Sequence, residues 1–345
     1  RARRESRISY ARAGVDGEEN LPSSFIGELR ADLLEAGYDE LEKAFAARPD
    51  MFFAPARETP VDLRDQELIK ELFDHNGFSV TALNNYLECP WKYFYTNLLR
   101  IPRAKVKHQM YGTAIHAALK DLFDSPNFFL PLVKGEGGSG VLAGTGGESP
   151  KDFLLKKFED HLRAEPLREE DFEESLARGR AALAGYYDQY RAIWSAKTLT
   201  ELNISGILLT LEIRLTGNID KIELLNDKEV NVVDYKTGRP KTKGEIEGAT
   251  KSSNGDIKRQ LIFYNLLLNK FENGRYRMVS GDIDFVEPDE KGRYKKERLV
   301  IAPEEVSALE KQIKEVSAEI LSAAFWGKRC GEKDCEFCPL REMMA

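Results

Sequence analysis

Apolar residues recur at helical spacing in several stretches of this chain. Between residues 153 and 162, and again between 183 and 190, apolar and aromatic residues repeat every three or four positions. This spacing puts them on one face of a helix, so two helices are expected within residues 151–195. Similar patterns predict further helices from the caps Ser79 and Thr81 through Tyr95, from near Gly112 past Leu119, over 257–270, and from Pro303 to about Trp326.

Alternating apolar and polar residues mark the expected strands. The alternation runs over residues 209–215, continues at Ile222 and Leu224, and resumes at 230–232 after a turn sequence at 226–228. Alternation is the period of a strand with one buried face, and three antiparallel strands are the simplest arrangement. Further strands are expected over 276–287 and 294–301. The whole pattern predicts an α/β fold, with a mixed central sheet flanked by helices.

Two stretches lack both periods. Residues 48–62 carry Pro55 and Pro60 among scattered charges and are expected to be a linker, and residues 135–149 hold seven glycines, which is typical of a flexible loop. We therefore expect residues 1–62 to be separate from a domain over 63–345. That domain would contain the glycine-rich loop and a helical insertion over 151–200.

Composition and charge narrow the class of protein. The chain has 345 residues, 42% of them hydrophobic, and this is enough to build a sizeable core. No run approaches the ~20 apolar residues that span a bilayer, and no leader sequence is apparent, so a cytoplasmic protein without membrane contact is expected. The net charge of -7 does not favour a uniformly basic surface, but it leaves room for a local basic channel.

Two aspartates and a lysine fall on adjacent expected strands, in the segments Gly217–Asp220 and Val232–Lys236. If a hairpin brings Asp220 and Asp234 to one edge of a sheet, their carboxylates can hold Mg²⁺ or Mn²⁺, which prefer oxygen ligands. Lys236 would stand beside the ion, an arrangement suited to phosphodiester hydrolysis. The alternative is that both aspartates are turn and strand-end residues paired with Lys221 and Lys236.

The four cysteines of the chain suggest a second metal site. Cys330, Cys335 and Cys338 lie within nine residues of one another, and Cys89 is far away in the sequence. This distribution is unlike a dispersed disulfide framework. Four thiolates can hold a tetrahedral Zn²⁺ or a 4Fe-4S cluster and would tie distant parts of the chain together. Unrelated free thiols are the alternative.

Four motifs in order resemble the PD-(D/E)XK nuclease superfamily, in its RecB-like branch. They are Gly112–His116, Asp220, Asp234–Gly238 and Gln260–Tyr264, and the resemblance covers roughly residues 78–341. It implies a restriction-endonuclease-like core. It also implies that His116, Asp220, Asp234 and the backbone carbonyl of Tyr235 bind the metal, and that Asp220, Asp234, Lys236, Gln260 and Tyr264 form the catalytic site.

Several of these residues also have a purely structural interpretation. A histidine such as His116 is more often packed within a helix, Tyr264 could belong to the core, and Gln260 could be solvated. Gln260 and Tyr264 lie four residues apart, so they share one helix face and can reach a substrate phosphate or brace Lys236. Glu212 could point to the same site or face solvent.

The cysteine spacing is similar to that of AddB-type nucleases, in which one cysteine before the core and three after it hold a structural 4Fe-4S cluster. Cys89 and the terminal trio match that order. In the family the shorter gap commonly comes first, whereas here the four-residue gap between Cys330 and Cys335 precedes the two-residue gap. This departure keeps Zn²⁺ open as the alternative.

The first residues resemble the end of a UvrD-like superfamily 1 helicase motor, through Arg1–Arg4, residues 8–11 and residues 22–26. The resemblance implies the carboxy-terminal nuclease part of a helicase-nuclease, with the motor in the same full-length chain. The sequence has no phosphate-binding loop of the Gly-x-x-x-x-Gly-Lys-Ser/Thr type, so the chain is not expected to hydrolyse ATP by itself.

Together these features predict a Mg²⁺- or Mn²⁺-dependent DNA nuclease that acts in repair or recombination, with single-stranded DNA as its substrate. A partner helicase or nuclease subunit would fit that role. The aromatic cluster Trp91, Tyr93, Phe94 and Tyr95 could stack on bases or belong to the core. The rival functions are a catalytically inactive DNA-binding module with a nuclease fold and a zinc-stapled interaction domain.

Overall fold

The computed structural model describes residue 63 and residues 65–125, 132–134, 140–142 and 149–344. The expected end of a helicase motor and the linker, over residues 1–62, lie outside the described residues, as does most of the glycine-rich loop at 135–149. A compact unit begins at Leu63.

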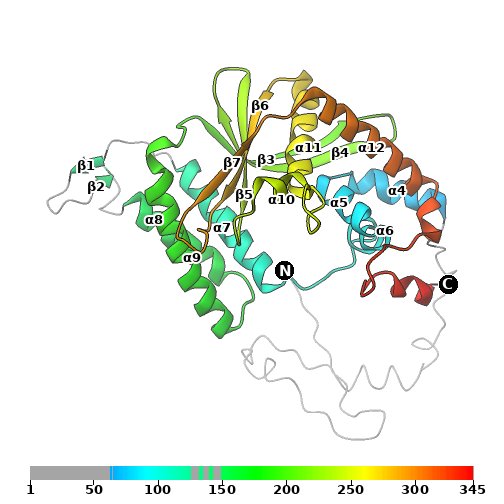
Figure 1. Ribbon diagram of the computed structural model, residues 1–345, viewed down its shortest axis with the longest axis horizontal. Helices are drawn as coiled ribbons and strands as arrows, with labels where there is room; N and C mark the ends of the chain where they lie inside the picture. Colours follow the sequence, from blue (N-terminus) through cyan, green and yellow to red (C-terminus); the bar gives the residue numbers. More distant parts are fainter. Residues whose placement is uncertain (1–62, 64, 126–131, 135–139, 143–148, 345) are drawn as a thin grey trace, which may run out of the picture. The chain divides into compact units, whose positions relative to one another are not determined.

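A five-stranded mixed sheet forms the centre of the described unit (Figure 1). Its strand order is β3-β4-β5-β6-β7. The neighbours β5 and β6 are parallel, and the other pairs are antiparallel. A parallel pair needs a crossover connection, which here includes the helices α10 (Lys243–Glu247) and α11 (Asp256–Lys270). The strands are β3 (Thr198–Leu208), β4 (Arg214–Leu224), β5 (Glu229–Lys236), β6 (Arg277–Phe285) and β7 (Lys295–Leu299).

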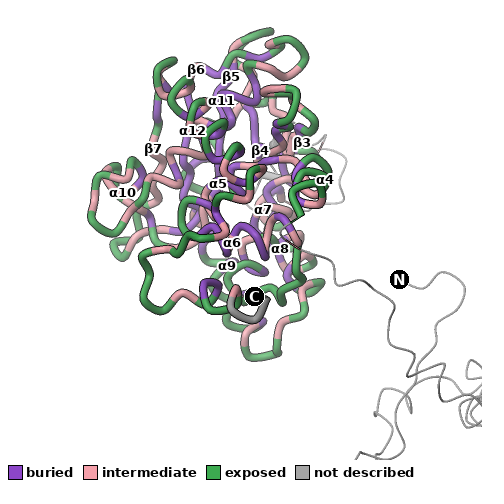
Figure 2. Tube along the Cα trace, turned by 90° about the vertical axis from the view of Figure 1, so that its right-hand side faces the viewer, coloured by how far each residue is buried: buried purple, intermediate pink, exposed green. Residues whose placement is uncertain are grey.

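The strand β5 is buried on both faces, because every residue from Val230 to Tyr235 is buried. Figure 2 shows the buried positions gathered along β5 and β6. A tight turn leads into β5, where the Asn226 side chain accepts hydrogen bonds from the backbone N–H groups of Lys228 and Glu229 at 3.0 and 2.8 Å. The turn predicted at 226–228 is therefore confirmed.

Helices cover both faces of the sheet and bury separate apolar clusters. One cluster joins α7, α8 and α9 to Val233 and Tyr235 of β5. The other joins α4, α5, α11 and α12 to Val232 of the same strand, so the unit has three layers. The helices are α4 (Gln66–Asn76), α5 (Val80–Glu88), α6 (Pro90–Tyr93), α7 (Lys107–Asp124), α8 (Pro150–Arg163), α9 (Glu169–Tyr190), α10 (Lys243–Glu247), α11 (Asp256–Lys270) and α12 (Pro303–Leu321).

Several short elements complete the described chain. They are a π-helix at Phe94–Leu98, a two-stranded pair β1 (Leu132–Lys134) and β2 (Gly140–Leu142), and 3-10 turns at Arg191–Ile193, Phe271–Asn273, Ala324–Gly327 and Pro339–Met344. None of the described helices is both long and apolar enough to pass through a lipid bilayer.

Most of the predicted helices are confirmed, with shifted ends. Two helices fill residues 150–190, and helices begin at Asp256 and Pro303. The helix expected near Gly112 begins earlier, at Lys107. The helix expected through Tyr95 is interrupted at Cys89, because Pro90 disfavours helical geometry in the residue before it.

One strand prediction is wrong. Residues 209–213 form the turn between β3 and β4, closed by the Leu209 N–H bonded to the Ile213 carbonyl at 2.9 Å, and Leu211 is 93% exposed. The first strand of the five-stranded sheet is instead β3, which begins at Thr198 inside the expected helical insertion. The apolar alternation at 209–215 belongs to a turn and to the start of β4.

The aromatic cluster near Cys89 belongs to the core. Trp91, Tyr93, Phe94 and Tyr95 are all buried, and Trp91 packs edge-on against Phe94 with ring centroids 5.6 Å apart. These rings are not available to stack on bases, so the core interpretation is the correct one.

Candidate active site and cysteine cluster

The strands β4 and β5 separate where the motif residues lie. Their ladder ends at the pair Lys221 and Val233, which are the chain neighbours of Asp220 and Asp234. Beyond that point the Asp220 carboxylate accepts the backbone N–H of Tyr235 at 2.9 Å. A side chain thus takes the place of the next ladder bond, and Asp220 is drawn towards the neighbouring motif.

Lys236 is held between a carboxylate and an amide. Its Nζ lies 2.6 Å from Asp234 Oδ2 and donates to Gln260 Oε1 at 2.8 Å. The Gln260 amide nitrogen in turn donates to the Tyr264 hydroxyl at 2.6 Å. Burial lowers the pKa of Lys236, but the Asp234 carboxylate outweighs this effect and the net shift is upward, so the ammonium persists at neutral pH.

The approach of α11 to the sheet depends on Gly217. A Cβ at this position would lie 2.7 Å from Leu267 Cδ1, closer than real Cβ contacts. The glycine therefore lets α11 pack closely on β4, which brings Gln260 and Tyr264 to the end of β5.

His116, Glu201 and Asp220 form a group with metal-ligand geometry. One donor atom from each of these side chains lies within 4.8 Å of the others. The imidazole Nδ1 of His116 is 3.5 Å from Asp220 Oδ1. Asp234 on β5 is not one of these three donors, but the charges of Asp220 and His116 both affect its pKa, and its Oδ1 is buried without a hydrogen-bond partner among the described residues.

Glu201 was not predicted from the sequence. It lies on β3 and has a left-handed backbone with φ of 48°, which is uncommon outside glycine. Its neighbours Thr200 and Leu202 pair with Lys221 and Ile219, so it stands opposite Asp220. Most residues of β3 are only partly buried or exposed, so the strand lacks the clear alternation that could have revealed it.

The electrostatics of the group fit a cation. Burial raises the pKa of Asp234 to about 6 and also raises the pKa of Glu201. Burial lowers the pKa of His116, but the Asp220 carboxylate outweighs it and the net shift is upward. A bound divalent cation would stabilise the ionised form of carboxylates whose pKa values are raised by burial. The donor set of carboxylates and one imidazole suits Mg²⁺ or Mn²⁺.

Glu212 lies apart from this group. It sits in the exposed turn between β3 and β4 and pairs with Lys70 of α4 at 3.2 Å. The expectation that Glu212 could point to the site is therefore wrong, and the solvent-facing alternative is right.

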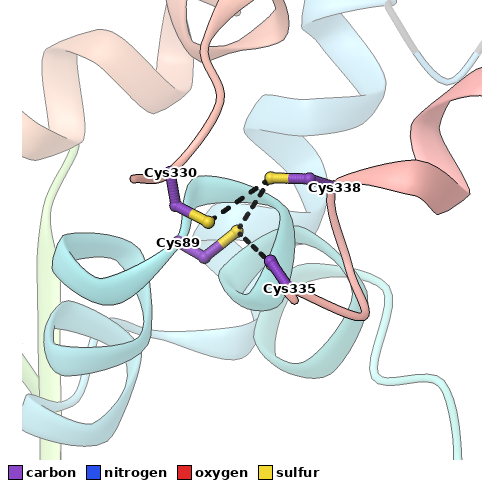
Figure 3. A group of neighbouring side chains, drawn as sticks. All are labelled: Cys89, Cys330, Cys335 and Cys338. Carbon is purple, nitrogen blue, oxygen red and sulfur yellow. Dashed lines mark hydrogen bonds between the residues drawn. The ribbon is translucent and has the colours of Figure 1, made fainter. Parts of the chain in front are cut away.

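The four cysteines converge from the two ends of the described unit (Figure 3). Cys89 lies at the junction of α5 and α6, and the other three lie in the terminal segment after α12. The Sγ atom of Cys338 is 3.7 Å from that of Cys89 and 3.5 Å from that of Cys330, and the Sγ atoms of Cys335 and Cys89 are 3.7 Å apart. All four sulfurs lie within 4.8 Å of one another.

These three sulfur–sulfur separations are close to those expected around a single tetrahedral ion. Four thiolates at ~2.3 Å from a tetrahedral Zn²⁺ stand about 3.8 Å apart, whereas a four-iron cluster needs a wider set of sulfurs. Burial opposes ionisation of Cys335, but the backbone N–H groups of Cys338 and Phe337 lower its pKa to about 7. Burial raises the pKa of Cys89, and a bound cation would offset that cost.

Comparison with known proteins gives the family. The sequence profile of the PD-(D/E)XK nuclease superfamily matches residues 77–343. A similar solved structure is the "Putative exonuclease" from Eubacterium rectale, with a TM-score of 0.43 and 9% identity, covering 82% of this chain and 93% of that chain. No curated protein matches the chain in sequence. Since the profile spans most of the chain and every residue of the candidate site, the chain belongs to the PD-(D/E)XK nuclease superfamily.

Proposed function

We propose that this chain is a metal-dependent deoxyribonuclease that hydrolyses phosphodiester bonds of single-stranded DNA. The observation that carries the proposal is the position of Lys236. Its ammonium is held between the Asp234 carboxylate and the Gln260 amide, next to the group formed by His116, Glu201 and Asp220. A fixed cation beside a cluster of metal-ligand donors suits attack on a phosphate.

The metal ligands in this proposal are His116, Glu201, Asp220, Asp234 and the backbone carbonyl of Tyr235. Asp220 is held by the Tyr235 N–H, and Asp234 carries an oxygen free of hydrogen bonds within the described chain. Mg²⁺ or Mn²⁺ bound there would supply an acidic water and neutralise phosphate charge.

The remaining site residues act on the substrate and on one another. Lys236 stabilises negative charge that develops on the phosphate, since its ammonium stays charged at neutral pH. Gln260 orients this ammonium, and Tyr264 orients Gln260 through its hydroxyl. Both are helix residues on a packed element, so they hold the lysine without needing to move.

The cysteine cluster holds a structural metal group in this proposal. The resemblance to AddB-type nucleases favours a 4Fe-4S cluster, and the sulfur spacing favours Zn²⁺. Iron and sulfide content, together with absorbance in the violet-blue, identifies the first, and one zinc per chain identifies the second. Either metal group would fasten α5 to the terminal segment, because Cys89 directly follows α5 and the other three cysteines lie in the terminal segment.

The wider role that we propose is the nuclease part of a helicase-nuclease in DNA repair or recombination. A motor in the same full-length chain, or a partner subunit, would deliver single-stranded DNA to the site. The competing function is an inactive DNA-binding module. It would need no ammonium held beside the metal-ligand group, and the intact arrangement around Lys236 therefore favours catalysis.

The test is cleavage of labelled single-stranded DNA by purified protein with Mn²⁺ or Mg²⁺. Asp234→Ala and Lys236→Ala are compared with wild type, with an EDTA control and with Lys311→Ala, which removes an exposed charge on α12. Metal-dependent cutting that both site variants lose and Lys311→Ala keeps would establish the nuclease. If folded, metal-loaded wild type binds the DNA but leaves it intact, the binding module is favoured. Parallel assays with double-stranded DNA and RNA measure the substrate preference.

A further inference from the structure

A buried carboxylate grips the turn that follows the proposed catalytic lysine. Glu287 is 8% exposed, and its Oε1 accepts the backbone N–H of Gly238 at 2.6 Å. The carboxylate also accepts two hydrogen bonds from Arg178, from Nε at 2.8 Å and from a terminal nitrogen at 2.9 Å. Such bidentate pairs fix both position and direction.

The sheet itself does not fix this turn. The last bond between β5 and the residues after β6 joins the Val286 N–H to the Lys236 carbonyl at 3.0 Å. Beyond it the chain turns at Gly238, whose φ of 92° is unfavourable for other residues. The Glu287 carboxylate therefore holds the backbone two residues after Lys236, where the regular ladder has ended.

Three elements meet at this carboxylate. Arg178 comes from α9, and its guanidinium lies over the ring of Tyr111 of α7, 4.7 Å from the ring centroid. The next residue of α7 is Gly112, where an added Cβ would lie 3.3 Å from the Thr237 hydroxyl. The same turn is thus bounded by the helix that carries His116 and tied through Glu287 to α9.

We propose that Glu287 is a positioning residue for phosphodiester cleavage, which holds the end of β5, and with it Lys236, in register with the metal-ligand group. Arg178 acts through Glu287. The inference rests on the proposed nuclease function and extends it, because it makes α9, expected from the sequence to belong to an insertion, part of the catalytic framework. A displacement of about 1 Å of a catalytic group can cost up to a hundredfold in rate.

The experiment compares four variants with wild type on single-stranded DNA. Glu287→Ala removes the acceptor of the Gly238 N–H, and Glu287→Gln keeps an acceptor of the same size. Arg178→Met removes the ion pair but keeps an unbranched apolar stem. The matched control is Arg180→Ala on the same helix, because Arg180 is 51% exposed against 48% for Arg178 and also pairs with a glutamate, Glu159.

Glu287→Ala is expected to lower kcat about tenfold or more at saturating DNA and Mn²⁺, while KM and the affinity for Mn²⁺ change less than threefold. Glu287→Gln is expected to recover kcat to within about threefold of wild type, and Arg178→Met to lose about threefold or more. Hydrogen exchange of the Gly238 amide gives a readout without catalysis. It should be slow in wild type and in Glu287→Gln, and fast in Glu287→Ala.

The outcomes separate the two proposals. If wild type cuts DNA and a folded Glu287→Ala variant keeps the same kcat, the positioning role is overturned. The role is also overturned if the control Arg180→Ala loses as much kcat as Glu287→Ala. If Glu287→Ala fails to fold, Arg178→Met decides, since a wild-type kcat there also overturns the role. Wild type that cuts nothing with any metal refutes the nuclease function, while the exchange of Gly238 still tests the hydrogen bond.

Discussion

The Asp220 carboxylate accepts the backbone N–H of Tyr235 at 2.9 Å, just past the last paired residues of β4 and β5. The Asp220 side chain therefore has two roles, because one carboxylate oxygen bonds the backbone of β5 and the other faces His116. Substitutions of Asp220 can separate its structural role, the hydrogen bond from the Tyr235 N–H, from its proposed role as a metal ligand.

Asp220→Asn should abolish cleavage with little loss of stability, whereas Asp220→Ala should lose both. An asparagine can still accept the Tyr235 N–H, but it lacks the charge that a divalent cation requires. Alanine leaves that N–H without its acceptor, which costs about 1–3 kcal/mol of unfolding free energy. Urea denaturation of the metal-free proteins measures the difference, and equal stability of the two variants would contradict the structural role.

Tyr264→Phe should lower kcat about three- to tenfold and Gln260→Ala about tenfold or more, with little change in KM. The phenylalanine keeps the packing of a side chain that is 2% exposed, but it removes the hydroxyl that accepts the Gln260 amide. Steady-state kinetics at saturating metal provide the measurement. Asn269→Ala is the control, since it removes a similar side-chain bond on the same helix, to Asn265; a loss of the same size there would mean that α11 is merely destabilised.

Removal of one cysteine should release the metal group and destabilise the protein. Cys89→Ser leaves three thiolates and breaks the link between α5 and the terminal segment, so we expect Tm to fall by about 5 °C or more, in line with a few kcal/mol. Metal content and thermal unfolding are measured on the same sample. Unchanged Tm in a variant that has lost its metal would show that the cluster does not support the fold.

Much of the fold could be predicted from periodicity because most elements bury one face. The helices within 150–190, at 256–270 and from Pro303 follow their apolar spacing, and β5 contains the alternation predicted at residues 230–232, although this strand is buried on both faces. The strand β3 was missed for a physical reason. Its burial is partial along most of its length, so its alternation is weak.

The candidate site was predicted unevenly for a related reason. Asp220, Asp234 and Lys236 are adjacent in the structure because two neighbouring strands carry them, and a hairpin can be inferred from sequence. The convergence of Cys89 with the terminal trio could be predicted because cysteine thiolates are metal ligands, whereas the contact of Arg178 with Glu287 joins segments far apart in the chain without such a signal. Such contacts depend on how the layers pack, and no local pattern records them.

Gly217→Ala should destabilise the protein by about 1–3 kcal/mol, because the new methyl group would press on Leu267. The same substitution in a Leu267→Val background should cost less, since the valine lacks the Cδ1 atom that lies 2.7 Å from the added Cβ. A double-mutant cycle from urea denaturation measures this coupling. Additive effects would show that α11 does not depend on the glycine for its approach to β4.

Metal binding should weaken steeply below about pH 6. Burial raises the pKa of Asp234 to about 6, so its carboxylate takes up a proton below that pH and competes with the metal. The pKa of His116 is raised as well, through Asp220, and its imidazole must also lose a proton to bind. The apparent Mn²⁺ affinity should thus fall by about ten- to a hundredfold per pH unit on the acidic side.

Lys236→Met provides the sharper form of this prediction. The Lys236 ammonium lowers the pKa of Asp234 against the effect of burial, so its removal should raise that pKa and move the loss of metal affinity to higher pH. In the metal-free protein the raised pKa lowers the stability of the fold as the pH rises from about 4 to about 6, because ionisation of the buried Asp234 carboxyl lowers the free energy of unfolding. Metal affinity changes in the opposite direction and rises with pH. Titration of Mn²⁺ binding between pH 5 and pH 8 in wild type and in Lys236→Met measures the shift. An unchanged midpoint would show that the ammonium does not control the charge of Asp234.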